Sequence, residues 1–324
     1  MTDGSSAAMV EVLTPIWERV LRRSPIGAND DFFDLGGDAG RAAELFVEIA
    51  RASGRRLRPT TICRASTIAT LTDLLEHALP SPNTPLTLLK NGQEEPPVFL
   101  THGIGGSIID FVPLARRIQT RRPIIGLQAP GNDDTEDPFD RVEDIARYYL
   151  EAINQIQPNG PYLLIGYSLG GLVMLDIAQR LSASDNVTSL VMLDSYPHFR
   201  HLSPGLRARV FVQRVRGALA GFIWDKKHKS EPPIGQRSDL STSRAVEGAN
   251  LALNRYQPRF YGGGIKFVKA QSVTCFPSDP TVVWGKLATK IEVESVAGDH
   301  VGMVTTHVDS LAAVLSRYVN GESK

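Results

Sequence analysis

Residues 162–171 read YLLIGYSLGG, and this stretch decides the fold. Its first four residues form an apolar run, which is typical of a strand buried on both faces of a parallel sheet. The following segment, LVMLDIAQRL from Leu172, has apolar residues at helical spacing. The motif glycines permit a tight turn between strand and helix. This strand–turn–helix order around G-x-S-x-G predicts a nucleophile elbow that exposes the Ser168 hydroxyl at the carboxyl end of the strand.

Five other apolar runs alternate with helical stretches around this motif. They are VFLTH from Val98, PIIGLQ from Pro123, VTSLVMLDS from Val187, IKFVKA from Ile265 and KIEVESV from Lys290. The alternation predicts a doubly wound α/β domain with a mostly parallel sheet over residues 97–322. Residues 198–258 break the rhythm with short helical patches between Arg, Ser, Gly and Pro residues, and we interpret them as a helical lid inserted over the sheet.

The first part of the chain has a different pattern. The segments MVEVLTPIWERVL, RAAELFVEIARA and TIATLTDLLEHAL carry apolar residues at helical spacing, and no convincing strand alternation accompanies them. We therefore expect a small all-α bundle over residues 1–79. The proline-rich stretch ALPSPNTPLTLLKNGQEEPP then predicts a linker over residues 80–96.

Composition limits the kinds of partner that the protein can bind and the cellular compartment in which we expect it. A chain of 324 residues is long enough for about two domains. The 35 basic residues cancel the 35 acidic ones, which argues against nucleic acid or an anionic membrane as a partner. The start resembles no signal peptide and no segment reaches membrane-spanning length, so we expect a cytoplasmic protein. Cys63 and Cys275 lie far apart without clustered histidines, and we expect two buried thiols and no metal site.

A serine nucleophile needs a base within hydrogen-bond reach and a third group that orients the base. In this fold the chain order is Ser, acid, His, which excludes His77 and His102 as the base. We select His300, in GDHVG, because it directly follows the last predicted strand. The remaining histidines lie in the lid or the last helix: His198, His201, His228 and His307.

For the acid, Asp194 is the first choice because it ends the strand after the elbow, at the same sheet edge as Ser168. Asp279, in FPSD, is the competitor, whereas Asp299 is too close to the base in sequence to reach it easily. The oxyanion hole should use the amide of Leu169.

The second oxyanion amide should come from the loop HGIGG. Ile104 is the first choice and Gly103 the second, and we interpret His102 as a residue that shapes this loop.

These motifs resemble two known families. NDDFFDLGGD, residues 29–38, resembles the entrance to helix 2 of a peptidyl or acyl carrier protein. THGIGGS, GLQAPG, GPYLLIGYSLGG, LVMLDSYP and GDHVGMV, in that order, resemble the type I thioesterases of the α/β-hydrolase superfamily in nonribosomal peptide and polyketide synthetases. The resemblance implies a carrier–thioesterase didomain with the triad Ser168, Asp194 and His300, and it favours Leu169 and Ile104 as oxyanion amides.

The sequence departs from the carrier pattern at Ala39. In the family, the residue after GGD is a serine that takes the phosphopantetheine arm, and alanine has no oxygen for that bond. This chain therefore has no attachable cofactor as written, and the arm is expected on the carrier that bears the substrate. An engineered Ser-to-Ala change and a natural degenerate carrier both fit. The helix itself should survive, with Asp38 as its cap, Gly54 at its end, and Leu45, Phe46 and Ile49 in the core.

The resemblance implies a terminal thioesterase, a serine hydrolase that releases an acyl or peptidyl product through an acyl-Ser168 intermediate. Release would occur by hydrolysis or by intramolecular or carbon–carbon bond formation. The implied partners are the carrier thioester and upstream synthetase domains, an adenylation domain or a condensation or ketosynthase domain. A free-standing serine ester hydrolase and a docking module with a degenerate carrier are the alternatives.

Overall fold

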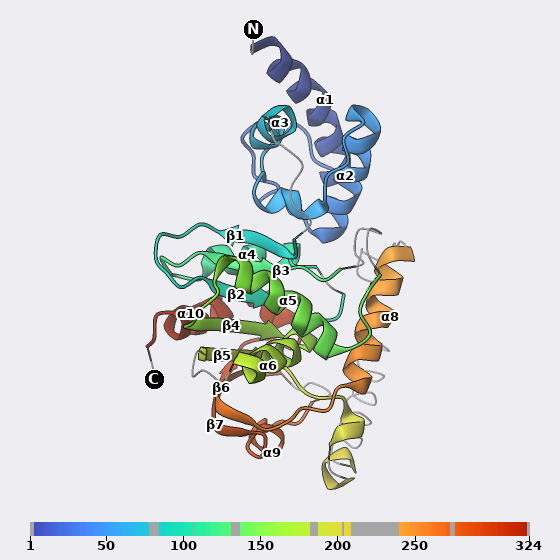
Figure 1. Ribbon diagram of the computed structural model, residues 1–324. Coiled ribbons are helices and arrows are strands. Elements are labelled where there is room, and N and C mark those ends of the chain that lie inside the picture. The colour runs from blue at the N-terminus through green and yellow to red at the C-terminus, as the bar shows by residue number, and fades with distance from the viewer. Residues whose placement is uncertain are drawn as a thin grey trace.

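The computed structural model describes residues 3–77, 84–105, 107–130, 137–181, 187–202, 204–208, 240–272 and 276–322. A helical domain stands over one end of a sheet-based domain (Figure 1). The helical domain, residues 3–77, contains α1 Asp3–Leu21, α2 Ala39–Ser53, the short 3₁₀ helix η1 Pro59–Cys63, and α3 Ile68–His77. These elements confirm the expected all-α bundle at the start of the chain.

Helix α2 begins and ends as its sequence predicts. The Asp38 carboxylate accepts a hydrogen bond from the backbone N–H of Arg41 at 2.8 Å and so satisfies one of the free amides of the first turn. Gly54 ends the helix with a left-handed backbone, φ 71°, and its N–H donates to Ala50. The residues expected in the core are buried: Leu45, Phe46 and Ile49.

The second domain is built on a seven-stranded sheet in the order β1-β3-β2-β4-β5-β6-β7. The strands are β1 Leu86–Lys90, β2 Val98–Thr101, β3 Ile124–Leu127, β4 Tyr162–Tyr167, β5 Val187–Leu193, β6 Tyr261–Ala270 and β7 Ala288–Val296. All neighbouring pairs are parallel except β1 with β3. This arrangement confirms the predicted mostly parallel sheet.

Strand β1 lies inside the segment 80–96 that the sequence analysis interprets as a linker. It is an edge strand, and Leu89 is its only buried side chain. Because it has neighbouring prolines and few buried residues, its composition is that of a linker. The local sequence pattern therefore does not distinguish an edge strand from a linker.

Helices cover both faces of the sheet, as a doubly wound fold requires. They are α4 Val112–Arg117, α5 Val142–Ile156, α6 Leu169–Leu181, α9 Thr281–Trp284 and α10 Val308–Val319. One apolar cluster joins α4 and α10 to one face and continues into the helical domain. A second cluster joins α5 and α6 to the other face. Both faces of the sheet are therefore covered, and Ser168 lies between the end of β4 and the start of α6.

The insertion predicted as a lid falls between β5 and β6. Its described parts are the 3₁₀ helix η4 Phe199–His201, residues 204–208, and α8 Leu240–Arg255, whereas residues 203 and 209–239 lie outside the described part of the chain. Helix α8 crosses near one end of α5 (Figure 1). The segment that leads into α5 packs closely on α8, because a Cβ on Gly248 would lie 2.8 Å from the carbonyl oxygen of Phe139.

Two further expectations concern cysteines and membranes. Cys63 is buried, and burial raises the pKa of its thiol to about 12. Cys275 lies outside the described residues. Within the described ranges, no helix combines the length and apolarity needed to cross a bilayer.

We predict that Gly166→Ala destabilises the protein, because a Cβ at this position would lie 2.3 Å from the carbonyl oxygen of Gly170. Overpacking of this kind costs about 1–3 kcal/mol. Urea unfolding measures the loss. Gly262→Ala is the matched control, since a Cβ there meets nothing within 4 Å. Equal effects of the two substitutions would contradict the packing assigned to the elbow.

Candidate active site

Two side chains leave the sheet at neighbouring strand ends with an unusual backbone. Ser168 follows β4 with φ 53°, and Asp194 follows β5 with φ 44°. Positive φ is rare outside glycine and costs about 1–3 kcal/mol, so the surroundings must hold it. The Ser168 N–H donates to Leu193 O at 2.9 Å, and the Asp194 N–H donates to Val268 O at 2.8 Å. The backbone of each residue is thus hydrogen-bonded to the neighbouring strand, while its side chain points past the carboxyl edge of the sheet.

His300 lies between these two side chains. Its Nε2 is 3.2 Å from Ser168 Oγ, and its Nδ1 is 2.8 Å from Asp194 Oδ2. Because Asp194 is buried, with 1% of its surface exposed, its charge acts on the imidazole with little screening by water. The three residues selected from the sequence therefore form a continuous hydrogen-bonded line from a hydroxyl through an imidazole to a carboxylate.

Aromatic rings hold the imidazole of His300 in place. The Tyr167 ring stacks on it at a centroid distance of 4.9 Å, and the Tyr167 hydroxyl donates to the His300 carbonyl oxygen at 2.7 Å. The Phe276 ring lies 5.2 Å away on a tilted plane. Sequence reasoning missed both residues. Tyr167 occupies a variable position of the G-x-S-x-G motif, and Phe276 comes from a loop, so neither carries a local signal.

The rejected acids have other partners. Asp279 Oδ1 accepts hydrogen bonds from the backbone N–H and the hydroxyl of Thr281 at the start of α9. Asp299 Oδ1 accepts from the backbone N–H of Gly302 at 2.6 Å. Both carboxylates therefore serve local turns.

Two of the other described histidines have partners in other parts of the chain. His201 contacts the Asn254 carbonyl oxygen and His77 pairs with Asp73, while His228 lies outside the described residues.

The loop after β2 lies directly against the elbow. A Cβ on Gly103 would be 3.0 Å from the Ser168 Cβ, and one on Gly170 would be 2.4 Å from the His102 carbonyl oxygen. The amide of Leu169 begins α6, where backbone N–H groups lack partners within the helix. The loop and the helix start thus approach the serine closely enough for their amides to face one bound oxygen.

His102 fixes the conformation of this loop. Its Nε2 accepts a hydrogen bond from the Ala129 N–H at 3.0 Å, so the proton is on Nδ1, which donates to Gly103 O at 2.8 Å. In a trans peptide the C=O and the next N–H point in opposite directions. The Ile104 N–H therefore points away from the His102 ring. A loop-shaping role, as the sequence analysis expects, follows from these contacts.

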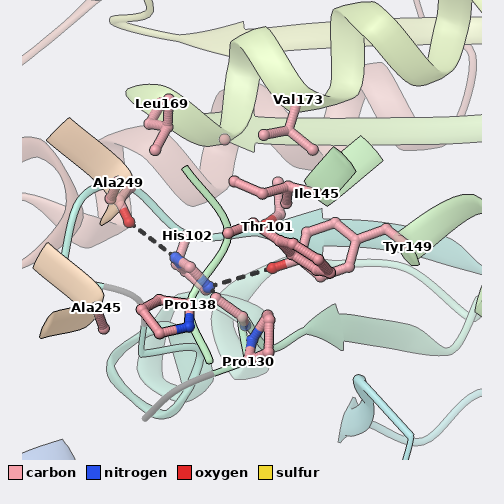
Figure 2. A pocket seen from close by; sticks show the side chains of 14 residues that line it. Thr101, His102, Pro130, Pro138, Ile145, Tyr149, Leu169, Val173, Ala245 and Ala249 are labelled. Carbon is pink, nitrogen blue, oxygen red and sulfur yellow. Dashed lines mark hydrogen bonds between the residues drawn. The ribbon is translucent and has the colours of Figure 1, made fainter. Parts of the chain in front are cut away.

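Burial lowers the pKa of His102 to about 4. Figure 2 shows the ring among the side chains around a small cavity of ≈ 30 Å³, enough for about one water molecule. Leu169 and Val173 of α6 and Ala245 and Ala249 of α8 line part of it. These apolar walls disfavour the imidazolium and keep the ring neutral.

Comparison with known proteins gives the class of the chain. A thioesterase-domain family matches residues 96–219, and a phosphopantetheine-attachment-site family matches residues 11–75. The fold and these matches define a carrier domain followed by a thioesterase domain of the α/β-hydrolase class. The chain belongs to the carrier–thioesterase didomains of the nonribosomal peptide synthetase family.

Relatives support this assignment. The chain is 30% identical to a dimodular nonribosomal peptide synthase of Bacillus subtilis (strain 168), over 82% of the chain and 12% of the relative. It is 37% identical to a nonribosomal peptide synthetase of Aspergillus terreus, over 70% of the chain and 25% of the relative. The chain thus spans a quarter or less of the length of these relatives.

Solved structures share the fold. A four-domain nonribosomal peptide synthetase bound to AMP and glycine matches with a TM-score of 0.58 and 23% identity, over 95% of this chain and 26% of that one. A thioesterase domain in covalent complex with a fluorophosphonate nocardicin G analogue matches with a TM-score of 0.54 and 20% identity, over 70% of this chain and 95% of that one.

The buried neutral state of His102 predicts a pH dependence of stability. In the unfolded chain the imidazole titrates near 6.5, so between about pH 4 and 6.5 the unfolded state binds more protons. The free energy of unfolding should therefore fall as pH drops through this window. His102→Gln should flatten that slope, because the substituted side chain does not titrate in this window. Chemical unfolding at a series of pH values checks this, and equal slopes in the two proteins would disprove it.

Proposed function

We propose that this chain is a terminal thioesterase that releases an acyl or peptidyl product from a phosphopantetheine thioester through an ester on Ser168. The observation that carries the proposal is the line of contacts from Ser168 through His300 to Asp194, at 3.2 and 2.8 Å. Ser168 and Asp194 lie in the region that matches the thioesterase family, which follows the region that matches the carrier family.

In the first half of the reaction, Ser168 Oγ attacks the thioester carbonyl while His300 Nε2 takes the hydroxyl proton. Asp194 holds the Nδ1–H tautomer and stabilises the imidazolium without becoming protonated. The amides of Leu169 and Ile104 donate to the oxyanion, each worth roughly 3–4 kcal/mol of barrier. Collapse breaks the C–S bond, and the proton on Nε2 passes to the leaving thiolate.

In the second half, His300 removes a proton from water or from a nucleophile within the acyl chain. Attack on the ester carbonyl then frees Ser168, which recovers its proton from Nε2. Water gives a free acid, and an internal nucleophile gives a ring. We take hydrolysis as the default, with the insertion that contains α8 controlling access of water.

Residue 39 supports a carrier role for the helical domain. Ala39 is the first residue of α2, and its N–H donates to Asp110 Oδ1 at 3.0 Å. The neighbour of Asp110, Phe111, lies 5.6 Å from the ring of Tyr167, which precedes the serine. Alanine has no hydroxyl, so this chain cannot hold the arm at residue 39, and the substrate comes on another carrier. Upstream synthetase domains would supply it.

The triad assignment predicts a contrast between two aspartates. Asp194→Ala should lower kcat by roughly 10⁴-fold, because the imidazole loses its orienting carboxylate. The control, Asp279→Ala, should retain wild-type kcat, since that side chain serves only the turn at Thr281. Turnover of an acyl-N-acetylcysteamine thioester measures both. Loss of activity in Asp279→Ala alone would show that the acid has been misassigned.

Covalent trapping tests the nucleophile. Incubation with an acyl thioester or a fluorophosphonate should add one acyl or phosphonyl group to the peptide that contains Ser168, and Ser168→Ala should abolish the addition. Mass spectrometry reads the site. A vestigial hydrolase within a docking module would not react, and a free-standing esterase would turn over short p-nitrophenyl esters while ignoring carrier-bound thioesters.

A further inference from the structure

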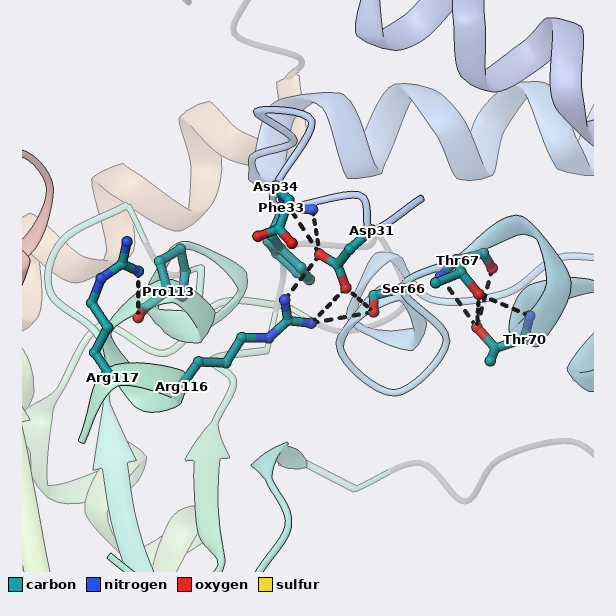
Figure 3. Close-up of polar contacts among 9 residues, drawn as sticks. All are labelled: Asp31, Phe33, Asp34, Ser66, Thr67, Thr70, Pro113, Arg116 and Arg117. Atoms are coloured by element: carbon teal, nitrogen blue, oxygen red, sulfur yellow. Dashed lines mark hydrogen bonds and ion pairs between the residues drawn. The ribbon is translucent and has the colours of Figure 1, made fainter. Parts of the chain in front are cut away.

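A charged contact joins the helical domain to the sheet domain. Arg116, in α4, donates from Nη1 to Asp31 Oδ1 and from Nη2 to Asp31 Oδ2, both at 2.9 Å (Figure 3). Its guanidinium also lies 5.0 Å from the centre of the Phe33 ring. A bidentate and stacked guanidinium fixes orientation as well as distance. This contact therefore specifies how the two domains meet.

The helical domain presents Asp31 ready for this pairing. The Ser66 hydroxyl donates to Asp31 Oδ2 at 2.6 Å, and the Phe33 N–H donates to Oδ1 at 2.9 Å. Burial raises the pKa of Asp31, but hydrogen bonds from Arg116 and Ser66 outweigh this effect and hold the pKa below 3.8. The carboxylate is consequently charged and already oriented at neutral pH.

A second contact between the domains involves residue 39, the position at which a loaded carrier would bear a phosphodiester. Asp110, in the 3₁₀ helix η2 Ile109–Phe111, accepts from the N–H of Ala39 at the positive end of α2. A phosphodiester on residue 39 would bring another negative charge close to Asp110 and Asp38. Like charges across an interface are costly, so this surface favours an occupant that carries no phosphodiester.

We propose that Asp110 and Arg116 form a carrier-selecting surface, and that the helical domain of this chain occupies it in cis and competes with loaded carriers from other chains. The competing partner is a carrier domain with an acidic residue at the position of Asp31. Arg116 attracts both occupants, and Asp110 favours the unloaded one. This inference rests on the proposed thioesterase function.

Three full-length variants test the contact. Asp31→Asn removes the charge from the helical domain but keeps an acceptor oxygen, and Arg116→Glu reverses the charge on the other side. Arg117→Glu is the matched control, because the adjacent arginine pairs instead with Asp309 at 2.7 Å and Pro113 O at 3.0 Å. Amide hydrogen exchange in residues 31–41 and 107–116 should rise in the first two variants and not in the third. Unchanged exchange in Arg116→Glu would overturn the docking contact.

The competition is measured with a donor chain that carries Ala39→Ser and Ser168→Ala and is loaded with an acyl phosphopantetheine arm, verified by mass. We expect Asp31→Asn to release the donor's acyl group about tenfold faster than the unsubstituted chain, because its surface is free. Arg116→Glu should gain nothing, because it no longer attracts the donor. Equal gains in both variants, or no gain in Asp31→Asn, would overturn the competition.

A small thioester separates this inference from the proposed function. Acyl-N-acetylcysteamine needs no carrier surface, so all three variants should hydrolyse it at the rate of the unsubstituted chain. If the chains hydrolyse acyl-N-acetylcysteamine but Asp31→Asn does not change release from the donor chain, only the competition is refuted. Failure of every chain to hydrolyse it would refute the thioesterase itself.

Discussion

The left-handed backbone at Ser168 and Asp194 is the constraint on which the site depends. Both residues extend the hydrogen-bond ladder one step past their strands, to Leu193 O and Val268 O. With an ordinary extended backbone, each side chain would continue the alternation of its strand and point into a packed face. The turn instead sends hydroxyl and carboxylate over the same edge, where one imidazole can bridge them. Backbone strain at two positions thus defines the separation that His300 spans.

Small residues at the start of α6 let the neighbouring loops pack closely against the turn that contains Ser168. Gly170 leaves room for the carbonyl oxygen of His102, and Gly171 leaves room for the side chain of Ser195, where a Cβ would lie 2.0 Å from Oγ. The loop after β2 and the residues that follow β5 therefore both pack on the first turn of α6. Ser168, Asp194 and the backbone of the loop after β2 therefore cannot shift independently, which is the kind of preorganisation that electrostatic stabilisation of a transition state requires.

The site residues that the sequence predicted are each marked by a short sequence pattern around them. Ser168 lies in a short motif, and Asp194 and His300 each follow an apolar run whose end must reach the same edge of a parallel sheet. The sequence did not predict strand β1, because an edge strand needs few buried residues. It did not predict the role of Tyr167, because the stacking of one ring on another produces no periodic sequence pattern. The pair Asp31 and Arg116 is 85 residues apart, so only the tertiary fold reveals it.

The loop beside Ser168 and the contact with the helical domain belong to one short segment of chain. From His102 to Arg116 the backbone carries in turn the loop-fixing imidazole, the Ile104 amide, the Asp110 carboxylate and the guanidinium that holds Asp31. Phe111 and Leu114 anchor this segment in the apolar cluster that continues into the helical domain. The helical domain therefore contacts the same stretch of chain whose beginning lies against Ser168. The position of residues 107–116 on the sheet is set by their apolar side chains, so packing places the guanidinium and the carboxylate that meet the helical domain.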